Sequence, residues 1–589
     1  METATEILEC PHGDRCGGCA LLGVPYSEQL ARKQLTVQRG FARYPAQSAL
    51  RIEPVAGAEP TTFYRTRAKW VFGEDGALGL FERDSHTVVD IPECRVLAPE
   101  LLRVAAAARR VLTRAGLDGL DLRLVDRGVM VTLIARAGTA QPELKRWAEA
   151  LVAECAEVRS VAASFREAGA ATVLGTQHVV LLGADVEPHH LQAKGPYHLA
   201  SHGAFTQAHL GQANAAHARI EQALRALGAK RVLELYAGSG ALSLRLAAVG
   251  LELTAVEAFA PALAHAERAA REQRLALTPL CVPAERALRD LAARKAHFDA
   301  VLVNPPRRGL SVEVRRGLAA LAPEAIAYMS CDSATLARDL SHLRDLGYGT
   351  SELWPFDMIP HSSAVECLVV ARRGTLPAPP VLFQNAQLIA VLKSGYEPIN
   401  RESGFDSCLL ERVRRLEDGK HAVPLPAQRL DLDCSGVCLF ARDAASLPAL
   451  EAAFRESKQT FVALARGVSH KRGRIRRPVR EGQRSVPAST RYLREGLRAG
   501  HSQLTIWPDG ASPTQLRQLL VGVGHPILGD ARFGDPASNT FFEHRHGLDR
   551  SFLHCSAVSL PFLNGHVTVE AALPGELSAV LASFGPSNE

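Results

Sequence analysis

The sequence predicts a multidomain protein with a cysteine-rich N-terminal module, an α/β domain with a Rossmann-like parallel sheet, and an α+β domain with a mixed sheet. Its 589 residues are too many for one hydrophobic core. Before the stretch "RRGTLPAPPV" (372–381), short apolar runs alternate with amphipathic segments, as in a parallel sheet with crossover helices. After that stretch, which is rich in proline and small residues, irregular strands and turns follow. The two sides of this boundary are therefore expected to fold differently.

These patterns divide the chain into five segments. Apolar residues make up 47% and charged residues 22% of the chain, which is typical of a folded globular protein. We expect a cysteine-rich module over residues 1–95, a central α+β domain over 96–195, the Rossmann-like domain over 196–373, a linker over 374–381 and the mixed-sheet domain over 382–589.

The sequence shows neither a membrane span nor a secretion signal. No run of eighteen or more uncharged apolar residues occurs, and the N-terminus lacks a basic-then-apolar pattern. We therefore expect a cytoplasmic monomer without a membrane partner. In such a protein the twelve cysteines favour metal ligation or catalysis over disulfides. The net charge of +6 permits a nucleic-acid partner without demonstrating one.

Four cysteines form a candidate metal site. Cys10, Cys16 and Cys19 stand close together in "ECPHGDRCGGCALLG", and the fourth ligand is expected to be Cys94 in "DIPECRVLAPE". Most of the remaining cysteines lie in apolar contexts, where a lone thiol is usually a small core residue. Zinc and an iron–sulfur cluster both accept four thiolates, so the chemistry alone does not choose between them.

The stretch "RVLELYAGSGALSLRLA" predicts a strand, a glycine-bearing loop and a helix. Gly238 and Gly240 let the backbone approach a cofactor at the carboxyl end of the strand. Ser243 replaces the third glycine of the dinucleotide fingerprint, so this loop alone is a weak signal. Glu257 ends the next strand, where a carboxylate can bind two ribose hydroxyls. That position fits S-adenosylmethionine as well as NAD.

Two further strand ends belong to the same rim. Asn304 follows the apolar strand in "VLVNPPRRGL", where two prolines hold a rigid, extended loop. Cys331 follows the next strand in "YMSCDSATLARDL", directly before a helix N-terminus, and this position is expected to favour its thiolate. A cysteine there could also be a core residue, but its combination with the Asn-Pro-Pro loop favours catalysis.

Several of these stretches resemble the iron–sulfur uracil-5-methyltransferases of RNA, over Glu9 to Arg373. They are the cysteine pattern with "YSEQLARKQ", "YRTRAKWVF" and "IPEC", and then "AFTQ", "ELYAGSG", "NPPRRG", "SCDSATLARD" and "FDMIPHSSAVECLVV". The resemblance implies that the four cysteines hold a [4Fe–4S] cluster that shapes the RNA-binding surface, with structural zinc as the alternative. The forms "VNPPRRG" and "FDMIPHSSAVE" are most similar to the short RlmC-type members, which methylate one uridine in 23S rRNA.

The same resemblance implies the roles of individual residues. Cys331 would attack C6 of the uracil, and Glu366 would remove the C5 proton after methyl transfer from S-adenosylmethionine. His209 departs from the family, which usually has Asn there, and this puts one contact of the cofactor pocket in doubt. The expected cofactor-binding residues are Gln207, Tyr236, Gly238, Glu257 and Asn304.

The C-terminal part resembles the RluA-type pseudouridine synthases. In "AQRLDLDCSGVCLFAR" the resemblance makes Asp431 the catalytic carboxylate, with Arg429 among the substrate-binding residues. Arg517 in "QLRQLL" would keep the carboxylate ionised, and Phe461 in "KQTFVALARG" would be a platform for the base. "GHPILGD" and "FLHCSAVSL" complete the pattern.

This second resemblance has several departures. Gln428 replaces the usual His, Cys434 replaces Thr or Ser, and Phe461 replaces Tyr. The stretch "DGASPTQLR" lacks the Arg and His of the common motif. Loss of one hydrogen-bonding group near a reacting base costs about 1–3 kcal/mol. Because Asp431 and Arg517 both remain, we favour an active enzyme over a non-catalytic RNA-binding module.

The two halves together predict a bifunctional enzyme that makes 5-methyluridine and pseudouridine in 23S rRNA, with tRNA as the alternative substrate. Fusion would raise the local concentration of one site around the substrate of the other. A basic run, "SHKRGRIRRPVREGQR" (469–484), could bind phosphates or could be a charged face of a strand and loop.

Overall fold

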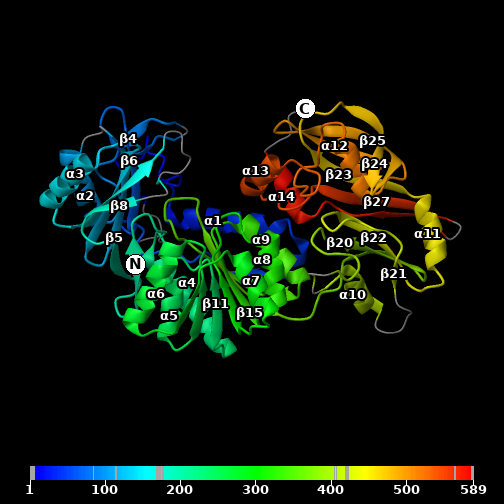
Figure 1. Ribbon diagram of the computed structural model, residues 1–589, viewed down its shortest axis with the longest axis horizontal. Coiled ribbons are helices and arrows are strands. Elements are labelled where there is room, and N and C mark those ends of the chain that lie inside the picture. Colours follow the sequence, from blue (N-terminus) through cyan, green and yellow to red (C-terminus); the bar gives the residue numbers. More distant parts are fainter. Residues whose placement is uncertain are drawn as a thin grey trace.

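Among the residues that it describes, the computed structural model contains three large sheets, each with its own layer of helices, and one two-stranded sheet (Figure 1). We call the parts built on the three large sheets the N-terminal, central and C-terminal lobes. The structure describes residues 7–83, 85–112, 116–167, 174–175, 178–205, 207–402, 405, 407–417, 424–562 and 565–584. Within these ranges no helix is both long enough and apolar enough to cross a membrane.

The N-terminal lobe is a seven-stranded sheet in the order β4-β3-β2-β5-β6-β7-β8, packed against two helices. Its apolar core comes from strand residues that alternate between the two faces and from the apolar stripes of the helices. The elements are β2 (Arg67–Phe72), β3 (Leu78–Phe81), β4 (Val88–Asp90), α2 (Pro99–Val111), β5 (Leu117–Val125), β6 (Gly128–Arg136), α3 (Gln141–Glu154), β7 (Val158–Arg166) and β8 (His178–Leu182).

The central lobe is a nine-stranded sheet in the order β1-β17-β18-β15-β14-β11-β12-β13, with β16 beside β18. The strands from β15 to β13 run parallel, and β18 is antiparallel to β15 and β17. Its strands are β1 (Arg51–Ile52), β11 (Arg231–Leu235), β12 (Glu252–Val256), β13 (Leu277–Leu280), β14 (Ala300–Val303), β15 (Ala325–Ser330), β16 (Tyr348–Gly349), β17 (Glu352–Phe356) and β18 (Glu366–Arg373).

Helices cover both faces of the central sheet, as a buried parallel sheet requires. A small hairpin of β9 (Val186–His190) and β10 (Tyr197–Ser201) leads into this lobe. The helices are α1 (Tyr26–Ala42), α4 (Leu210–Leu227), α5 (Ala241–Ala248), α6 (Ala260–Gln273), α7 (Ala284–Ala293), α8 (Val312–Leu321) and α9 (Ser333–Asp345). The expectation of a Rossmann-like domain in a multidomain chain is confirmed.

The C-terminal lobe is a ten-stranded mixed sheet in the order β19-β20-β22-β27-β23-β26-β25-β24, with β21 beside β22 and β28 beside β27. Only β22 and β27 pair in parallel. The elements are β19 (Val381–Gln384), β20 (Leu388–Lys393), α10 (Leu409–Arg414), β21 (Leu425–Pro426), β22 (Ser435–Ala441), α11 (Leu447–Arg455), β23 (Lys458–Ala465), β24 (Arg472–Glu481), β25 (Arg484–Arg498), β26 (His501–Pro508), α12 (Pro513–Val521), α13 (Pro536–His546), β27 (Leu553–Phe562), β28 (Gly565–Glu570) and α14 (Gly575–Ser583).

The sheets do not follow the expected boundary at residue 95. Helix α1 packs against α9, and β1 pairs with β17, so this segment lies on the central sheet. Strand β2 pairs with β5 instead, which joins both sides of residue 95 in the N-terminal sheet. The physical reason is strand pairing, because β1 and β2 are short strands whose hydrogen-bond partners, β17 and β5, lie beyond residue 95.

Buried charges join the central and C-terminal lobes in what we call the interdomain charge cluster. Arg315 and Arg338 of α8 and α9 both pair with Asp339 and with Asp549 of the C-terminal lobe. Tyr396 donates a hydrogen bond of 2.7 Å to the same Asp549 carboxylate. Burial would raise the pKa of Asp549, but the two arginines outweigh burial and lower it. The lobes are therefore held by more than their short linker.

Candidate active sites

The carboxyl ends of the central strands surround a cavity of about 260 Å³. Between β11 and α5, Tyr236, Gly238 and Gly240 all adopt positive φ angles of 62°, 56° and 74°. This left-handed turn lets the backbone N–H of Gly238 donate to Glu257 at 3.0 Å, while Phe259 N–H donates to the other Glu257 oxygen at 2.8 Å. The cavity is lined by all five expected cofactor-binding residues, Gln207, Tyr236, Gly238, Glu257 and Asn304.

These residues fit S-adenosylmethionine. The Glu257 carboxylate is fixed by two backbone donors and can accept hydrogen bonds from two ribose hydroxyls. Gln207 and Asn304 supply amide groups, and Tyr236 and Phe259 supply aromatic faces. An aromatic and amide lining of this kind suits a nucleoside with a charged amino-acid end.

The loop that carries Gln207 is held by two arginines of the N-terminal sheet. Arg123 donates to the carbonyls of Ser201 at 2.8 Å and Phe205 at 3.1 Å. Arg67 donates to the Gly203 carbonyl at 3.1 Å and forms a two-bond ion pair with Asp121. Burial, together with the neighbouring Arg67, lowers the pKa of Arg123 to about 9. The sequence analysis did not identify these arginines, whose only sequence signal is a charged residue within an apolar strand.

Cys331 and Glu366 lie next to each other at the ends of two paired strands. The register of β15 and β18 places Ser330 opposite Cys367, so the residues that follow and precede them meet at the rim. Burial and then the Glu366 charge raise the pKa of Cys331, while Arg307 lowers it. Burial likewise raises the pKa of Glu366 to about 7, against the effect of Arg307. The three side chains therefore form one electrostatic unit.

The pKa of Cys331 corrects the expectation of a favoured thiolate. The N-cap of α9 is Asp332, whose carboxylate accepts hydrogen bonds from Ala334 and Thr335 N–H. These contacts consume the helix N-terminal donors, and the Asp332 charge adds to that of Glu366. Burial and two negative neighbours thus outweigh the helix dipole.

The four cysteines line a second cavity, of about 270 Å³, in the N-terminal lobe. Burial raises the pKa of Cys19 to about 12, and the charges of Cys94, Cys16 and Cys10 act in the same direction. Among the described residues, no group of three or more His, Cys, Asp or Glu side chains is arranged to hold a single metal ion. All four thiols nevertheless line the same cavity, whose wall also includes Phe205, which lines the cofactor cavity as well.

In the C-terminal lobe Asp431 is held by α12. Thr514 Oγ1 donates to both Asp431 oxygens at 2.8 and 2.9 Å, and Arg517 donates to one of them at 2.9 Å. Arg517 also forms two hydrogen bonds each with Asp433 and Asp530. Burial alone would lower the pKa of Arg517. The three carboxylates outweigh the effect of burial, so the pKa of Arg517 is raised. The structure thus brings Arg517 to Asp431, together with three residues to which the sequence analysis gave no role.

Two buried cations, Lys393 and Arg550, hold the loop that bears Asp431 through its backbone carbonyls. Lys393 Nζ donates to the carbonyls of Ser394, Leu432 and Cys434 at 2.8, 3.0 and 2.8 Å. Arg550 donates to the Asp433 carbonyl at 3.1 Å, and it follows Asp549 of the interdomain charge cluster. A loop held at so many carbonyls presents its carboxylate in one position.

Comparisons with known proteins identify the central lobe. Residues 191–373 match the family model of tRNA (uracil-5-)-methyltransferases. An uncharacterised RNA methyltransferase of Halalkalibacterium halodurans is 29% identical over 391 residues, which cover 63% of this chain and 84% of the relative. Residues 191–373 are thus similar in sequence to RNA uracil-5-methyltransferases. We call the central lobe the methyltransferase lobe from here on.

Two solved structures are similar to a share of the chain each. The Pyrococcus abyssi tRNA (uracil-54, C5)-methyltransferase, solved with S-adenosyl-L-homocysteine, is 20% identical, covers 60% of this chain and 86% of its own, and has a TM-score of 0.48. Human RNA pseudouridylate synthase domain containing 4 is 20% identical, covers 35% of this chain and 92% of its own, and has a TM-score of 0.31.

His209 lies outside the cofactor cavity of the methyltransferase lobe. It is the N-cap of α4 and accepts a hydrogen bond from Gln212 N–H. Its other ring nitrogen lies 3.0 Å from the Pro60 carbonyl, and its ring stacks on Tyr64 at 5.0 Å. The residue that departs from the family therefore joins α4 to the N-terminal segment.

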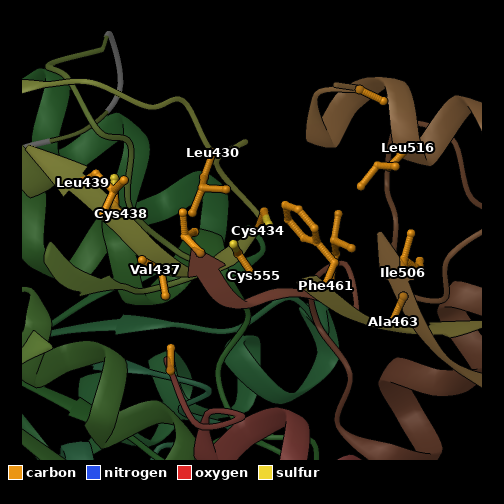
Figure 2. Close-up of a cluster of buried hydrophobic side chains, with 14 of the residues drawn as sticks. Leu430, Cys434, Val437, Cys438, Leu439, Phe461, Ala463, Ile506, Leu516 and Cys555 are labelled. Carbon is orange, nitrogen blue, oxygen red and sulfur yellow. The ribbon is translucent and has the colours of Figure 1, made fainter. Parts of the chain in front are cut away.

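Phe461 and Arg429 do not join the contacts around Asp431. The Phe461 side chain is fully buried in the core of the C-terminal sheet, where Figure 2 shows its ring between Cys434 and Leu516. Its strand neighbours are Ile506 and Cys555, so both sides of β23 are covered. Arg429 is exposed. In this structure the face of Phe461 is not open to a base.

Arg307→Gln is expected to shift the pH dependence of methylation upward. The reactive forms expected here are the Cys331 thiolate and the Glu366 carboxylate, so raising either pKa would lower the active fraction at a given pH. Arg307 lowers both pKa values. The rate at saturating RNA should therefore fall at pH 7 and recover as the pH rises toward 9.

The matched control for this pH profile is Arg308→Gln. Arg308 is the next residue, but its guanidinium faces His544 at 3.1 Å. Its profile should match that of the unchanged protein. Equal profiles for both variants would contradict the electrostatic role of Arg307.

Proposed function

We propose that the protein is a bifunctional RNA-modification enzyme that methylates C5 of one uridine and isomerises another uridine to pseudouridine. The adjacency of Cys331 and Glu366 carries the first activity. Asn304 lines the cofactor cavity and Arg307 acts on both reactive groups, so one short loop borders the cofactor and the nucleophile. A nucleophile, a base and a methyl donor are the components that uracil C5-methylation needs.

The proposed methylation proceeds in three steps on the residues of this chain. The Cys331 thiolate attacks C6 of uracil, forming a carbon–sulfur bond and making C5 nucleophilic. S-adenosylmethionine, when bound, supplies the methyl group through its sulfonium. Glu366 then takes the C5 proton. The electron pair of the C5–H bond forms the C5=C6 double bond, and the carbon–sulfur bond breaks to release the Cys331 thiolate. A base with a pKa of about 7 is suited to accept this proton at neutral pH.

The proposed activity of the C-terminal lobe rests on Asp431. Three ion-paired carboxylates around Arg517 keep the site charged although it is partly buried. An ionised Asp431 could act at ribosyl C1′ or through glycal formation once a flipped uridine enters. The alternative is a non-catalytic RNA clamp, which needs no such buried carboxylate.

We further propose that Cys10, Cys16, Cys19 and Cys94 hold a [4Fe–4S] cluster in the N-terminal lobe, with zinc as the alternative. A cavity of about 270 Å³ suits a polyatomic cluster better than one ion. Protein purified without oxygen should contain about four iron and four sulfide per chain, and Cys94→Ser should lower both. Cys155→Ser, outside the cavity, should not. Stoichiometric zinc without sulfide would overturn the cluster.

We propose 23S rRNA as the substrate of a cytoplasmic monomer, with the two target uridines in one loop. The alternative is tRNA, which the matching family model names. The test is nucleoside mapping by mass spectrometry, with chemical tagging of pseudouridine, after incubation with S-adenosylmethionine. Unmodified 23S rRNA and unmodified tRNA are compared. Both products in one 23S loop would support the proposal, and products confined to tRNA or to different molecules would overturn the target.

A further inference from the structure

The last hairpin of the C-terminal sheet carries a concentration of exposed arginines. Strands β24 and β25 pair over their first ten residues, from Arg472 opposite Leu493 to Glu481 opposite Arg484. Strand β24 is the outer edge of the sheet (Figure 1). We call this pair of strands the arginine hairpin; its exposed basic residues are Arg472, Arg474, Arg476, Arg477, Arg480, Arg484 and Arg491.

The strand period gives the hairpin one basic face. Ile475 and Val479 are buried against the lobe, whereas Arg474, Arg476 and Arg480 lie at alternate positions on the opposite, solvent-facing side. Alternate residues of a strand are about 7 Å apart. Together with Arg472, the face therefore carries a row of cations that is interrupted at Pro478. By the same register Arg477 and Arg484 belong to the other face, with Arg484 beside the turn. A linear polyanion matches such a row better than a single anion does.

Protection of the sheet edge does not account for this much charge. One or two charged residues are enough to prevent edge pairing. Arg474 stands directly opposite Arg491, an arrangement that repels, and only Asp509 bridges the two. Among the described residues, no carboxylate forms an ion pair with the remaining exposed arginines of the hairpin, which are Arg472, Arg476, Arg477, Arg480 and Arg484.

The arginine hairpin is attached to the helix that holds Asp431. Gln518 of α12 bonds both the N–H and the carbonyl of Arg480, at 2.9 and 3.0 Å. Gln515 bonds Glu481, beside the turn, at 2.7 Å. The same helix supplies Thr514 to the Asp431 carboxylate. A chain that follows the arginines toward the turn is thereby led to the N-terminus of α12.

We propose that the arginine hairpin binds the phosphate backbone of the RNA whose uridine enters the Asp431 site. This inference rests on the proposed function of the C-terminal lobe and names the surface that holds its substrate. The arginines neutralise successive phosphates, and the RNA in turn relieves the repulsion between Arg474 and Arg491. Because the contacts are with phosphates, the hairpin adds affinity and position without sequence preference.

The test compares two quadruple variants of the full chain that lose the same charge. The first replaces Arg472, Arg476, Arg480 and Arg484 by Gln; the control replaces the exposed Arg286, Arg289, Arg294 and Lys295 in and after α7. Affinity for unmodified 23S rRNA is measured from 50 to 300 mM KCl. The slope of log K against log salt should become shallower by about 3 in the hairpin variant, at 0.7–0.9 for each lost phosphate contact. The control should keep its slope.

A second readout separates this inference from the proposed function. If Asp431 is catalytic, the hairpin variant should raise the KM for pseudouridine formation with kcat unchanged. If the C-terminal lobe is only a clamp, pseudouridine is absent from every variant, but the salt slope still changes. An unchanged slope together with an unchanged KM would overturn the proposal.

Two further measurements keep the test decisive. Should the quadruple variant aggregate, the single variants Arg476→Gln and Arg480→Gln should each reduce the slope by about 0.7–0.9. Vesicles of phosphatidylglycerol and phosphatidylcholine test a membrane as the occupant. Hairpin-dependent binding to these vesicles, with RNA affinity unchanged, would overturn the proposal in favour of a lipid surface.

Discussion

Cys331→Ala is expected to abolish methylation while leaving pseudouridine formation intact. Without the thiolate no bond forms at C6, and C5 of uracil is too weak a nucleophile to take the methyl group. Loss of a covalent nucleophile lowers a rate by about 10⁴-fold or more. The measurement is methyl transfer from labelled S-adenosylmethionine to RNA. The control is Cys281→Ala, which removes an exposed thiol from the same lobe and should keep full activity.

Glu366→Gln should stop the same reaction at a later step. The amide cannot take the C5 proton, so the methylated uracil stays bonded to Cys331 and a protein–RNA adduct accumulates. A denaturing gel should show this adduct for Glu366→Gln and not for the double variant with Cys331→Ala. Normal turnover of Glu366→Gln would exclude Glu366 as the base, and a persistent adduct in the double variant would exclude Cys331 as the nucleophile.

Asp431→Asn is expected to remove pseudouridine formation and to leave methylation unchanged. The substitution keeps the size of the side chain and its contact with Thr514 but removes the charge that acts on the ribose. We expect a loss of about 10³-fold or more, as for other essential catalytic groups. The measurement is pseudouridine content after chemical tagging, read beside 5-methyluridine in the same RNA.

Asp433→Asn is the matched control for this experiment. Asp433 and Asp431 have similar exposed fractions, 25% and 24% of the side chain, and both pair with Arg517. Asp433 accepts two hydrogen bonds from Arg517, whereas Asp431 accepts one. The control therefore weakens the pairing of Arg517 at least as much as Asp431→Asn does. Its activity should fall by no more than about tenfold. Equal losses in the two variants would indicate that the charge balance around Arg517 matters and that Asp431 has no special role. Full pseudouridine formation by Asp431→Asn would exclude Asp431 as the catalytic carboxylate. Absence of pseudouridine from the unchanged protein as well would indicate a non-catalytic clamp.

Sequence reasoning located the cofactor cavity because the topology of a parallel sheet is simple. Gly238, Glu257 and Asn304 each follow a strand, and the carboxyl ends of parallel strands meet at one edge. The N-terminal boundary could not be found in this way. Whether β1 joins the central sheet and β2 the N-terminal sheet depends on pairings with strands 300 and 55 residues away, which no local pattern encodes.

Electrostatic properties were harder to predict than positions. The helix that follows Cys331 was visible in the sequence, but the burial that outweighs its dipole was not. In the same way, Arg517 was recognised as a cation near Asp431, while its bonds to Asp433 join a helix to a loop 84 residues away along the chain. Phe461 was expected to face a base, but its side chain is fully buried in the core of the C-terminal sheet.

The interdomain charge cluster has a consequence for how the protein unfolds. Separation of the methyltransferase lobe from the C-terminal lobe would leave Arg315 and Arg338 with one carboxylate between them and Asp549 with none of its arginines. Opposite charges attract more strongly in a buried contact than in water, so each lobe loses this stabilisation when its partner unfolds. The folded state of each lobe therefore depends on the other, and heating should melt the pair in one calorimetric transition instead of two.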